Sequence, residues 1–205
     1  MSKPFALALD VETTGLNPEN HAVIEIGAVV LNDRLEPGWE FPEPTFRLLL
    51  QPHEGAIIDP HALRINGHAW AIVPQSETYQ KAWEPREGWL VLQNWLRGHF
   101  PEMQYVRLVG WNIGFDYRFM EALFDHTRGY YKPTVWPFHY HTLDLCGICT
   151  YLDVKKGQQR RSYSLQNVAK DVLPEGYSSK FGAAHTALAD TLTALEVLHA
   201  IERSS

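Results

Sequence analysis

The stretch ALDVETTGL, residues 8–16, places two carboxylates at the end of an apolar segment. The apolar residues before them predict a short buried β-strand. Because side chains at i and i+2 of a strand project from the same face, Asp10 and Glu12 should point together from the strand's carboxyl end. Two carboxylates held close and partly out of water repel each other unless a cation neutralises them. The pair therefore indicates either a site for Mg²⁺ or Mn²⁺, or a capping Asp10 beside a solvent-facing Glu12 in a turn.

Two further acids fall on helical faces that should be buried. Asp116 is followed at three, four and seven positions by Phe119, Met120 and Leu123. Asp190 is followed at four, seven and eleven positions by Ala194, Val197 and Ile201. This spacing is typical of an inward-facing helical stripe, where a bare carboxylate costs several kcal/mol unless it has a partner. Metal binding by all four acids would supply that partner in every case.

Composition indicates one compact domain over residues 1–205. The chain has 205 residues, 45% of them hydrophobic, so it can bury one sizeable core. A net charge of -6 excludes a broad basic surface of the kind that holds long nucleic acid, so a polyanion would be gripped locally. With two cysteines, no apolar stretch typical of a signal peptide and no membrane-spanning run, we expect a soluble cytoplasmic protein that does not contact a membrane.

Hydrophobic periodicity predicts an α/β fold, a mixed β-sheet with helices on both faces. Strands are predicted over residues 5–10, 22–31, 45–52 and 105–112, and a strand leading into a helix over 141–152. Helices are predicted over residues 57–68, within 83–100, and over 115–126, 161–172 and 185–202. The segment 70–88, rich in Pro, Trp and Glu, is interpreted as an insertion.

Three segments together resemble a known family. DVETTGL at residues 10–16, GWNIGFD at 110–116 and HTALAD at 185–190 look like the three exonuclease motifs of the DEDD superfamily of 3′→5′ exonucleases, in the same order. The stretch PFHYHTLDLCGIC at residues 137–149 is similar to ribonuclease T-like members, and DVETTGL to DNA polymerase III epsilon-like members. Three ordered motifs are far more specific than one short pattern. The resemblance implies a ribonuclease H-like fold.

The resemblance also implies a two-metal site. Asp10, Glu12 and Asp190 would hold one Mg²⁺, and Asp10 with Asp116 the second, with Mn²⁺ able to substitute. Glu25, which interrupts the apolar run AVIEIGAVV, is not expected to be a fifth ligand; we interpret it as structural and bonded to a turn.

A histidine would act as the general base. His185 precedes Asp190 by five residues, whereas the tyrosine branch of the superfamily has its base four residues before the acid, where this chain has Thr186. We therefore expect the histidine branch, with His185 in the loop before the last helix and its imidazole taking a proton from the attacking water. The alternative is a histidine that only caps the helix start.

Further residues are assigned to substrate binding by the same resemblance. The turn of Thr13, Thr14, Gly15 and Leu16 would meet the terminal 3′ hydroxyl, with Leu16 wedged between bases. Asn112 and Phe115 would line the nucleotide pocket, although Asn112 could simply hold its turn. Ile65 and His68 would either pack against the terminal base or serve only the fold.

The sequence thus predicts a metal-dependent 3′→5′ exonuclease that acts on single-stranded 3′ ends and releases nucleoside 5′-monophosphates. DNA is the first choice of substrate, because the residues TTGL of the first motif resemble those of proofreading and DNA-degrading members. RNA is the second choice, as for a ribonuclease T-like exoribonuclease. A catalytically silent nucleic-acid-binding domain of the same fold is the alternative from a different class. The resemblance leaves open a homodimer and a polymerase partner.

Overall fold

The computed structural model describes residues 4–38, 44–101, 106–127, 135–174 and 185–203. A five-stranded sheet has the order β3-β2-β1-β4-β5. Its strands are β1 (Ala6–Thr13), β2 (Val23–Leu31), β3 (Thr45–Leu49), β4 (Arg107–Gly110) and β5 (Leu143–Asp144). β2 is antiparallel to its neighbours β1 and β3, whereas β1, β4 and β5 are parallel. The mixed sheet confirms the predicted α/β class.

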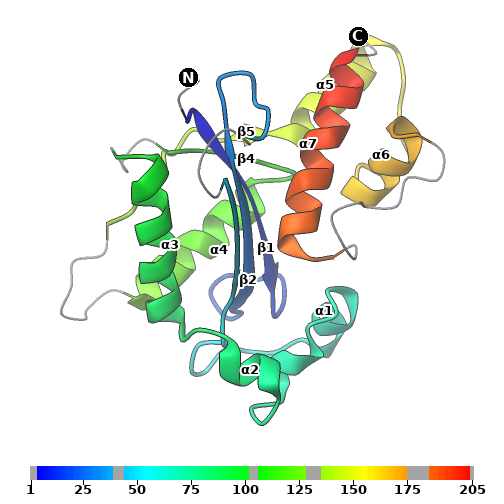
Figure 1. The fold of residues 1–205 in the computed structure, drawn as a ribbon. Helices are drawn as coiled ribbons and strands as arrows, with labels where there is room; N and C mark the ends of the chain where they lie inside the picture. The colour runs from blue at the N-terminus through cyan, green and yellow to red at the C-terminus, as the bar shows by residue number, and fades with distance from the viewer. Residues whose placement is uncertain (1–3, 39–43, 102–105, 128–134, 175–184, 204–205) are drawn as a thin grey trace.

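Helices cover both faces of this sheet (Figure 1), as predicted. One face carries α3 (Pro85–His99) and α4 (Gly114–Thr127), and the other carries α5 (Leu145–Lys155), α6 (Leu165–Val172) and α7 (Ala187–Arg203). Three short helices lie between β3 and α3: α1 (Pro60–Ile65), the 3₁₀ helix η1 (Ala69–Ile72) and α2 (Glu77–Lys81). No helix among the described residues is long and apolar enough to cross a lipid bilayer.

The alternation of β1 explains where its acids point. Leu7, Leu9 and Val11 lie in the core shared with α3 and α4, whereas Ala6 and Ala8 lie in the core shared with α5, α6 and α7. Asp10 and Glu12 continue the second set, because side chains two residues apart share a face. Both acids therefore belong to the face that α7 covers.

A glycine on β2 lets α7 approach this part of the sheet. Gly27 is the β2 partner of Asp10. A Cβ atom at Gly27 would lie only 2.1 Å from the backbone nitrogen of Leu188 in the first turn of α7. The hydroxyl of Thr191 also donates to the Gly27 carbonyl, at 3.4 Å. The absent side chain thus allows the start of α7, with Asp190, to sit directly over Asp10.

Several predicted boundaries were wrong. The helix predicted over residues 57–68 is shorter: the side chain of Asp59 caps α1 at His61, and Gly67, with φ +70°, turns the chain after Ile65. The first strand extends three residues beyond the predicted end at Asp10, because it pairs with β2 as far as Thr13. The segment 70–88 contains most of η1, all of α2 and the start of α3.

Candidate active site

Three carboxylates meet at the carboxyl end of β1. One oxygen each of Asp10, Glu12 and Asp190 lies within 4.8 Å of the other two. Within the part of the chain that the structure describes, this is the one group of three or more Asp, Glu, His or Cys side chains whose ligand atoms are so close. The structure thus brings together three of the four acids that the sequence singled out, and this acid cluster can hold a divalent cation.

The fourth acid joins this cluster through the backbone. Asp116, in the first turn of α4, is 3% exposed. Its Oδ1 atom accepts a hydrogen bond from the backbone N–H of Val11, at 2.9 Å. Since Val11 lies between Asp10 and Glu12, this bond fixes α4 against the same three residues of β1. Asp116 is therefore placed beside the three carboxylates, although it is not one of the three whose oxygens are mutually close.

The electrostatics of the cluster favour a bound cation. Burial raises the pKa of Asp10 well above its ordinary range, and the negative charges of Asp116, Glu12 and Asp190 raise it further. Burial, together with the charge of Asp190, raises the pKa of Glu12 to about 8. Burial likewise raises the pKa of Asp116 to about 8 and shifts that of Asp190 upward. Ionisation of four neighbouring carboxyl groups is unfavourable without a cation, and their oxygen atoms form a donor set that suits hard divalent ions.

Two side-chain amides that sequence reasoning missed contact the cluster. Gln166, at the start of α6, donates from Nε2 to Oδ2 of Asp190 at 3.3 Å. Asn66, which ends α1, donates from Nδ2 to the Thr13 carbonyl at 3.1 Å, and a hydrogen bond from its side chain lowers the pKa of Glu12 against the effect of burial. Gln166 thus holds the carboxylate of Asp190, and Asn66 lies beside that of Glu12, and neither amide adds charge. No signal in the sequence pointed to these contacts, since 24 residues separate Gln166 from Asp190.

His185 lies just before α7, as predicted. Its backbone adopts φ +66°, a left-handed conformation that is uncommon for a residue other than glycine. Its backbone N–H donates to Oδ1 of Asp190 at 3.5 Å. The position of the proposed base is thereby coupled to a carboxylate of the acid cluster, and strained backbone of this kind is often found at functional sites.

Asn112 and Phe115 lie between β4 and Asp116. Asn112 also has a left-handed backbone, with φ +57°, and its N–H donates to Oδ1 of Asp144 at 3.0 Å. The same oxygen of Asp144 caps the start of α5. The Asn112 side chain is exposed, whereas Phe115 is half-buried with its ring centroid 4.7 Å from that of Phe119. The turn is therefore held by its backbone, which leaves the Asn112 amide open to a ligand.

The turn after Glu12 has both structural and exposed members. Thr14 is fully buried, donates to the Ile57 carbonyl and accepts from the Ala22 N–H, so its hydroxyl holds the loop. Thr13 donates to the Gly15 carbonyl at 2.7 Å. Gly15 packs against His21, where a Cβ atom would clash. Leu16, in contrast, is 81% exposed and available for contact.

Ile65 and His68 differ in how far their side chains are buried. Ile65 is half-exposed, whereas His68 is buried and its Nε2 pairs with the fully buried Glu25. Glu25 also accepts from Nε of Arg47 at 2.8 Å. Burial would raise the pKa of Glu25, but the hydrogen bonds from His68 and Arg47 outweigh it and leave the pKa below its ordinary value. The prediction that Glu25 bonds to a turn was therefore incomplete, since it joins His68 to a neighbouring strand.

Comparisons with known proteins agree with this geometry. The chain matches the family described as RNase_T, Exonuclease, over residues 7–198. It is 41% identical to ribonuclease T of Yersinia pestis over 63 residues, which are 31% of this chain and 29% of that protein. The aligned segment thus spans less than a third of the relative's length.

Solved structures share the fold. A zinc-bound complex of Escherichia coli exonuclease I with single-stranded DNA matches with a TM-score of 0.71 at 19% identity, covering 100% of this chain and 41% of that one. The nuclease domain of 3′hExo, described as a DEDDh family member bound to rAMP, matches with a TM-score of 0.66 at 17% identity, covering 97% of this chain and 92% of that one. These similarities confirm the predicted fold class.

Proposed function

The chain belongs to the exonuclease family that it matches over residues 7–198, and we propose that it is a divalent-metal-dependent 3′→5′ exonuclease of single-stranded nucleic acid. The observation that carries the proposal is the meeting of Asp10, Glu12 and Asp190 beside a fourth acid, Asp116, that is bonded to the same strand. A capping aspartate with a solvent-facing glutamate does not account for this convergence. The complete set of acids also argues against a catalytically silent binding domain.

The acids divide between two ions in this proposal. Asp10, Glu12 and Asp190 would hold one Mg²⁺, and Asp10 with Asp116 the second, and Mn²⁺ could substitute for either. Bound there, two such ions would supply the charge that orients an attacking water and stabilises the leaving 3′ oxygen of a phosphodiester. Gln166 keeps Asp190 turned toward the cluster, and Asn66 does the same for Glu12.

His185 is the base of the reaction. A ring nitrogen of its imidazole would accept the proton of the attacking water, a task that enzymes assign to histidine more often than to any other side chain. The hydrogen bond from its backbone to Asp190 supports this role, because it ties the base to a metal ligand. The product is a nucleoside 5′-monophosphate and a strand shorter by one residue.

The strand's 3′ end is held by residues around the cluster. Leu16 and Ile65 are exposed and provide the apolar contacts with the bases, together with Phe115. The Asn112 amide and the backbone of the turn at Thr13, Thr14 and Gly15 contact the sugar and its 3′ hydroxyl. His68 acts indirectly, since it is buried against Glu25.

DNA remains our first choice of substrate and RNA the second. Exonuclease I has been solved with single-stranded DNA, which supports DNA, whereas the similarity to ribonuclease T supports RNA. We place the enzyme in the cytoplasm, as a single domain over residues 1–205, where its two cysteines stay free thiols. A homodimer and a polymerase partner are compatible with this function.

The test uses two single strands of matched sequence, one DNA and one RNA, each labelled at the 5′ end. With Mg²⁺ we expect a ladder that shortens from the 3′ end, and no ladder with EDTA or in the Asp190→Ala variant. The strand degraded faster identifies the substrate class. Absence of any ladder, with Mn²⁺ as well as Mg²⁺, would refute the exonuclease and favour the silent binding domain.

A further inference from the structure

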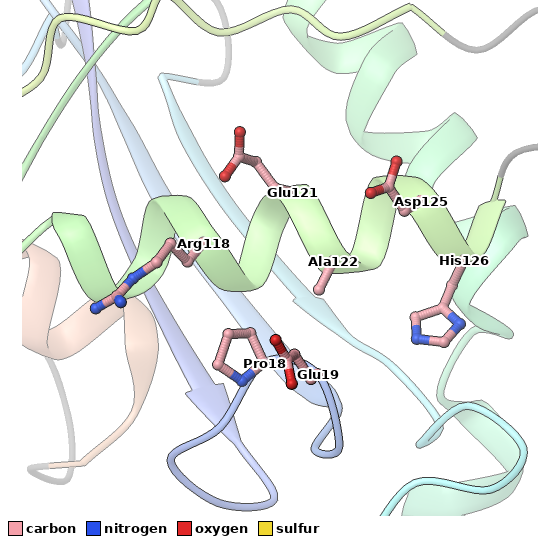
Figure 2. Close-up of a pocket in the computed structure, with 7 residues that line it drawn as sticks. All are labelled: Pro18, Glu19, Arg118, Glu121, Ala122, Asp125 and His126. Carbon is pink, nitrogen blue, oxygen red and sulfur yellow. The ribbon is translucent and has the colours of Figure 1, made fainter.

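A cavity of about 480 Å³ lies between α4 and the turn that follows β1. Pro18 lines it on the turn, and Arg118, Ala122 and His126 line it along the helix. Figure 2 shows these side chains, with Arg118 at the end of the cavity where α4 begins. Pro18 comes two residues after Leu16, the exposed residue that we expect to contact the bases. The cavity therefore adjoins the path of the substrate strand.

The Arg118 side chain is directed toward the start of α4. Its Nε atom donates to the carbonyl oxygen of Gly114, at 3.1 Å. Gly114 is the first residue of α4, and Asp116 in the same turn bonds to β1 beside the acid cluster. Figure 2 shows the guanidinium displaced along the helix axis in this direction. The bond thus holds a positive charge at the end of the cavity nearest the acid cluster.

The protein does not neutralise the charge of Arg118. Three carboxylates also line the cavity, those of Glu19, Glu121 and Asp125. In Figure 2 the carboxylates of Glu121 and Asp125 extend from the side of α4 that faces away from Glu19. Over the ranges that the structure describes, Arg118 forms no ion pair with a carboxylate. One of its five N–H groups is used within the helix, so four are left for a ligand.

A single-stranded nucleic acid requires such a charge beside the acid cluster. The chain has a net charge of -6, so its overall field repels a polyanion. Metal ions in the acid cluster would act on the scissile phosphate, which leaves the neighbouring phosphates to side chains of the protein. Phe115, which we expect to contact a base, precedes Arg118 by three residues, so the two side chains are neighbours on the surface of α4. A base against Phe115 would bring its phosphate close to the guanidinium.

We propose that Arg118 binds a backbone phosphate of the substrate strand on the 5′ side of the scissile bond. This contact rests on the proposed exonuclease function and extends it to the strand beyond the cleaved nucleotide. A guanidinium matches two phosphate oxygens at once, which an ammonium group does not. Because every nucleotide carries the same phosphate, the contact adds affinity and fixes the path of the strand without selecting a base. A substrate that consists of one nucleotide has no phosphate at this place.

The experiment compares two substrates that differ in this phosphate. One is a 5′-labelled single strand, and the other is the p-nitrophenyl ester of a nucleoside 5′-monophosphate. For the strand, Arg118→Gln should raise KM by about 5-fold to 10-fold and leave kcat unchanged, and Arg118→Lys should recover part of the loss. For the ester, Arg118→Gln should match the wild type. The matched control Arg97→Gln removes an exposed arginine from the last turn of α3, at the other end of the sheet (Figure 1), and should match the wild type with both substrates.

Salt dependence identifies the lost contact as a phosphate contact. The slope of log kcat/KM against log salt concentration should be smaller by about 0.7 in Arg118→Gln, the contribution of one phosphate of a single strand. Fluorescence anisotropy of the labelled strand in EDTA compares the affinities without turnover, so an inactive wild type, which would refute the exonuclease, still tests Arg118. Equal strand affinity and equal salt slope in the wild type and Arg118→Gln would overturn the proposal, as would a wild type that binds no strand. A loss of the same size with the ester would also overturn it, because the effect would then lie at the acid cluster.

Discussion

Replacing Glu12 with glutamine should stabilise the metal-free protein at high pH. The pKa of Glu12 is about 8 against an ordinary value of 4.5. Because the pKa of Glu12 is raised in the folded state, the contribution of this group to the free energy of unfolding is fully present below about pH 4.5 and is lost as the pH rises through about 8. One pKa unit corresponds to about 1.4 kcal/mol, so full relief of this shift is worth about 5 kcal/mol. The buried amide has its own desolvation cost, so we expect a gain of about 2–5 kcal/mol.

Urea unfolding in EDTA at acidic, neutral and alkaline pH measures this gain. Glu12→Gln should match the wild type at pH 5 and exceed it increasingly toward pH 9. With Mg²⁺ the order should reverse, because the wild type alone keeps the full set of ligands. The control Glu202→Gln, at an exposed position of α7, should follow the wild type throughout. A Glu12→Gln variant no more stable than the wild type at pH 9 in EDTA would refute the reasoning.

Three further variants test other parts of the site. Gln166→Met removes the hydrogen-bond donor to Asp190 and should lower kcat and Mg²⁺ affinity by about 10-fold to 100-fold with little change in KM. Calorimetric Mg²⁺ titration measures the affinity, with Asn167→Met on the same helix as the control. Unchanged Mg²⁺ affinity in Gln166→Met would exclude a role for Gln166 in holding Asp190. His185→Ala should lower kcat by about 10²-fold to 10⁴-fold, and a wild-type rate in single-turnover assays would require another base. Gly27→Ala should lower the free energy of unfolding by about 3 kcal/mol, because the added methyl group pushes α7 away from β2. In the control Gly98→Ala the added Cβ meets nothing within 4 Å, so this variant should be as stable as the wild type or more stable. Equal urea midpoints for the two variants would show that α7 does not need this close approach to β2.

The acids were predictable because each obeys a short-range rule. Asp10 and Glu12 follow the two-residue period of a strand, and Asp116 and Asp190 lie on apolar helical stripes. The structure buries the apolar partners of both stripes as expected. His185 was placed in a loop because its spacing from Asp190 does not fit the helical face. Local periodicity therefore sufficed to identify the residues that converge.

Partners from distant segments could not be predicted in this way. Periodicity shows which face a residue occupies but not what packs against that face. Gln166 reaches Asp190, and Asn66 reaches Thr13 across 53 residues, only because α6 and α1 dock beside β1 and α7. The stacking of His53 on His126 depends on the same kind of docking. The shortened α1 reflects the left-handed backbone of Gly67, which sequence alone marks as permitted but not as used.

The most direct test of the acid cluster is the number of protons released when Mg²⁺ binds at pH 7. Because the pKa values of Glu12 and Asp116 are both about 8, each is largely protonated before the ion binds and must ionise to hold it. Calorimetric titrations in buffers of different ionisation enthalpy give this number. We expect more than one proton per chain in the wild type and fewer in Glu12→Gln. Mg²⁺ binding without proton release, or release unchanged in Glu12→Gln, would contradict the assignment of these acids as the metal ligands of an exonuclease.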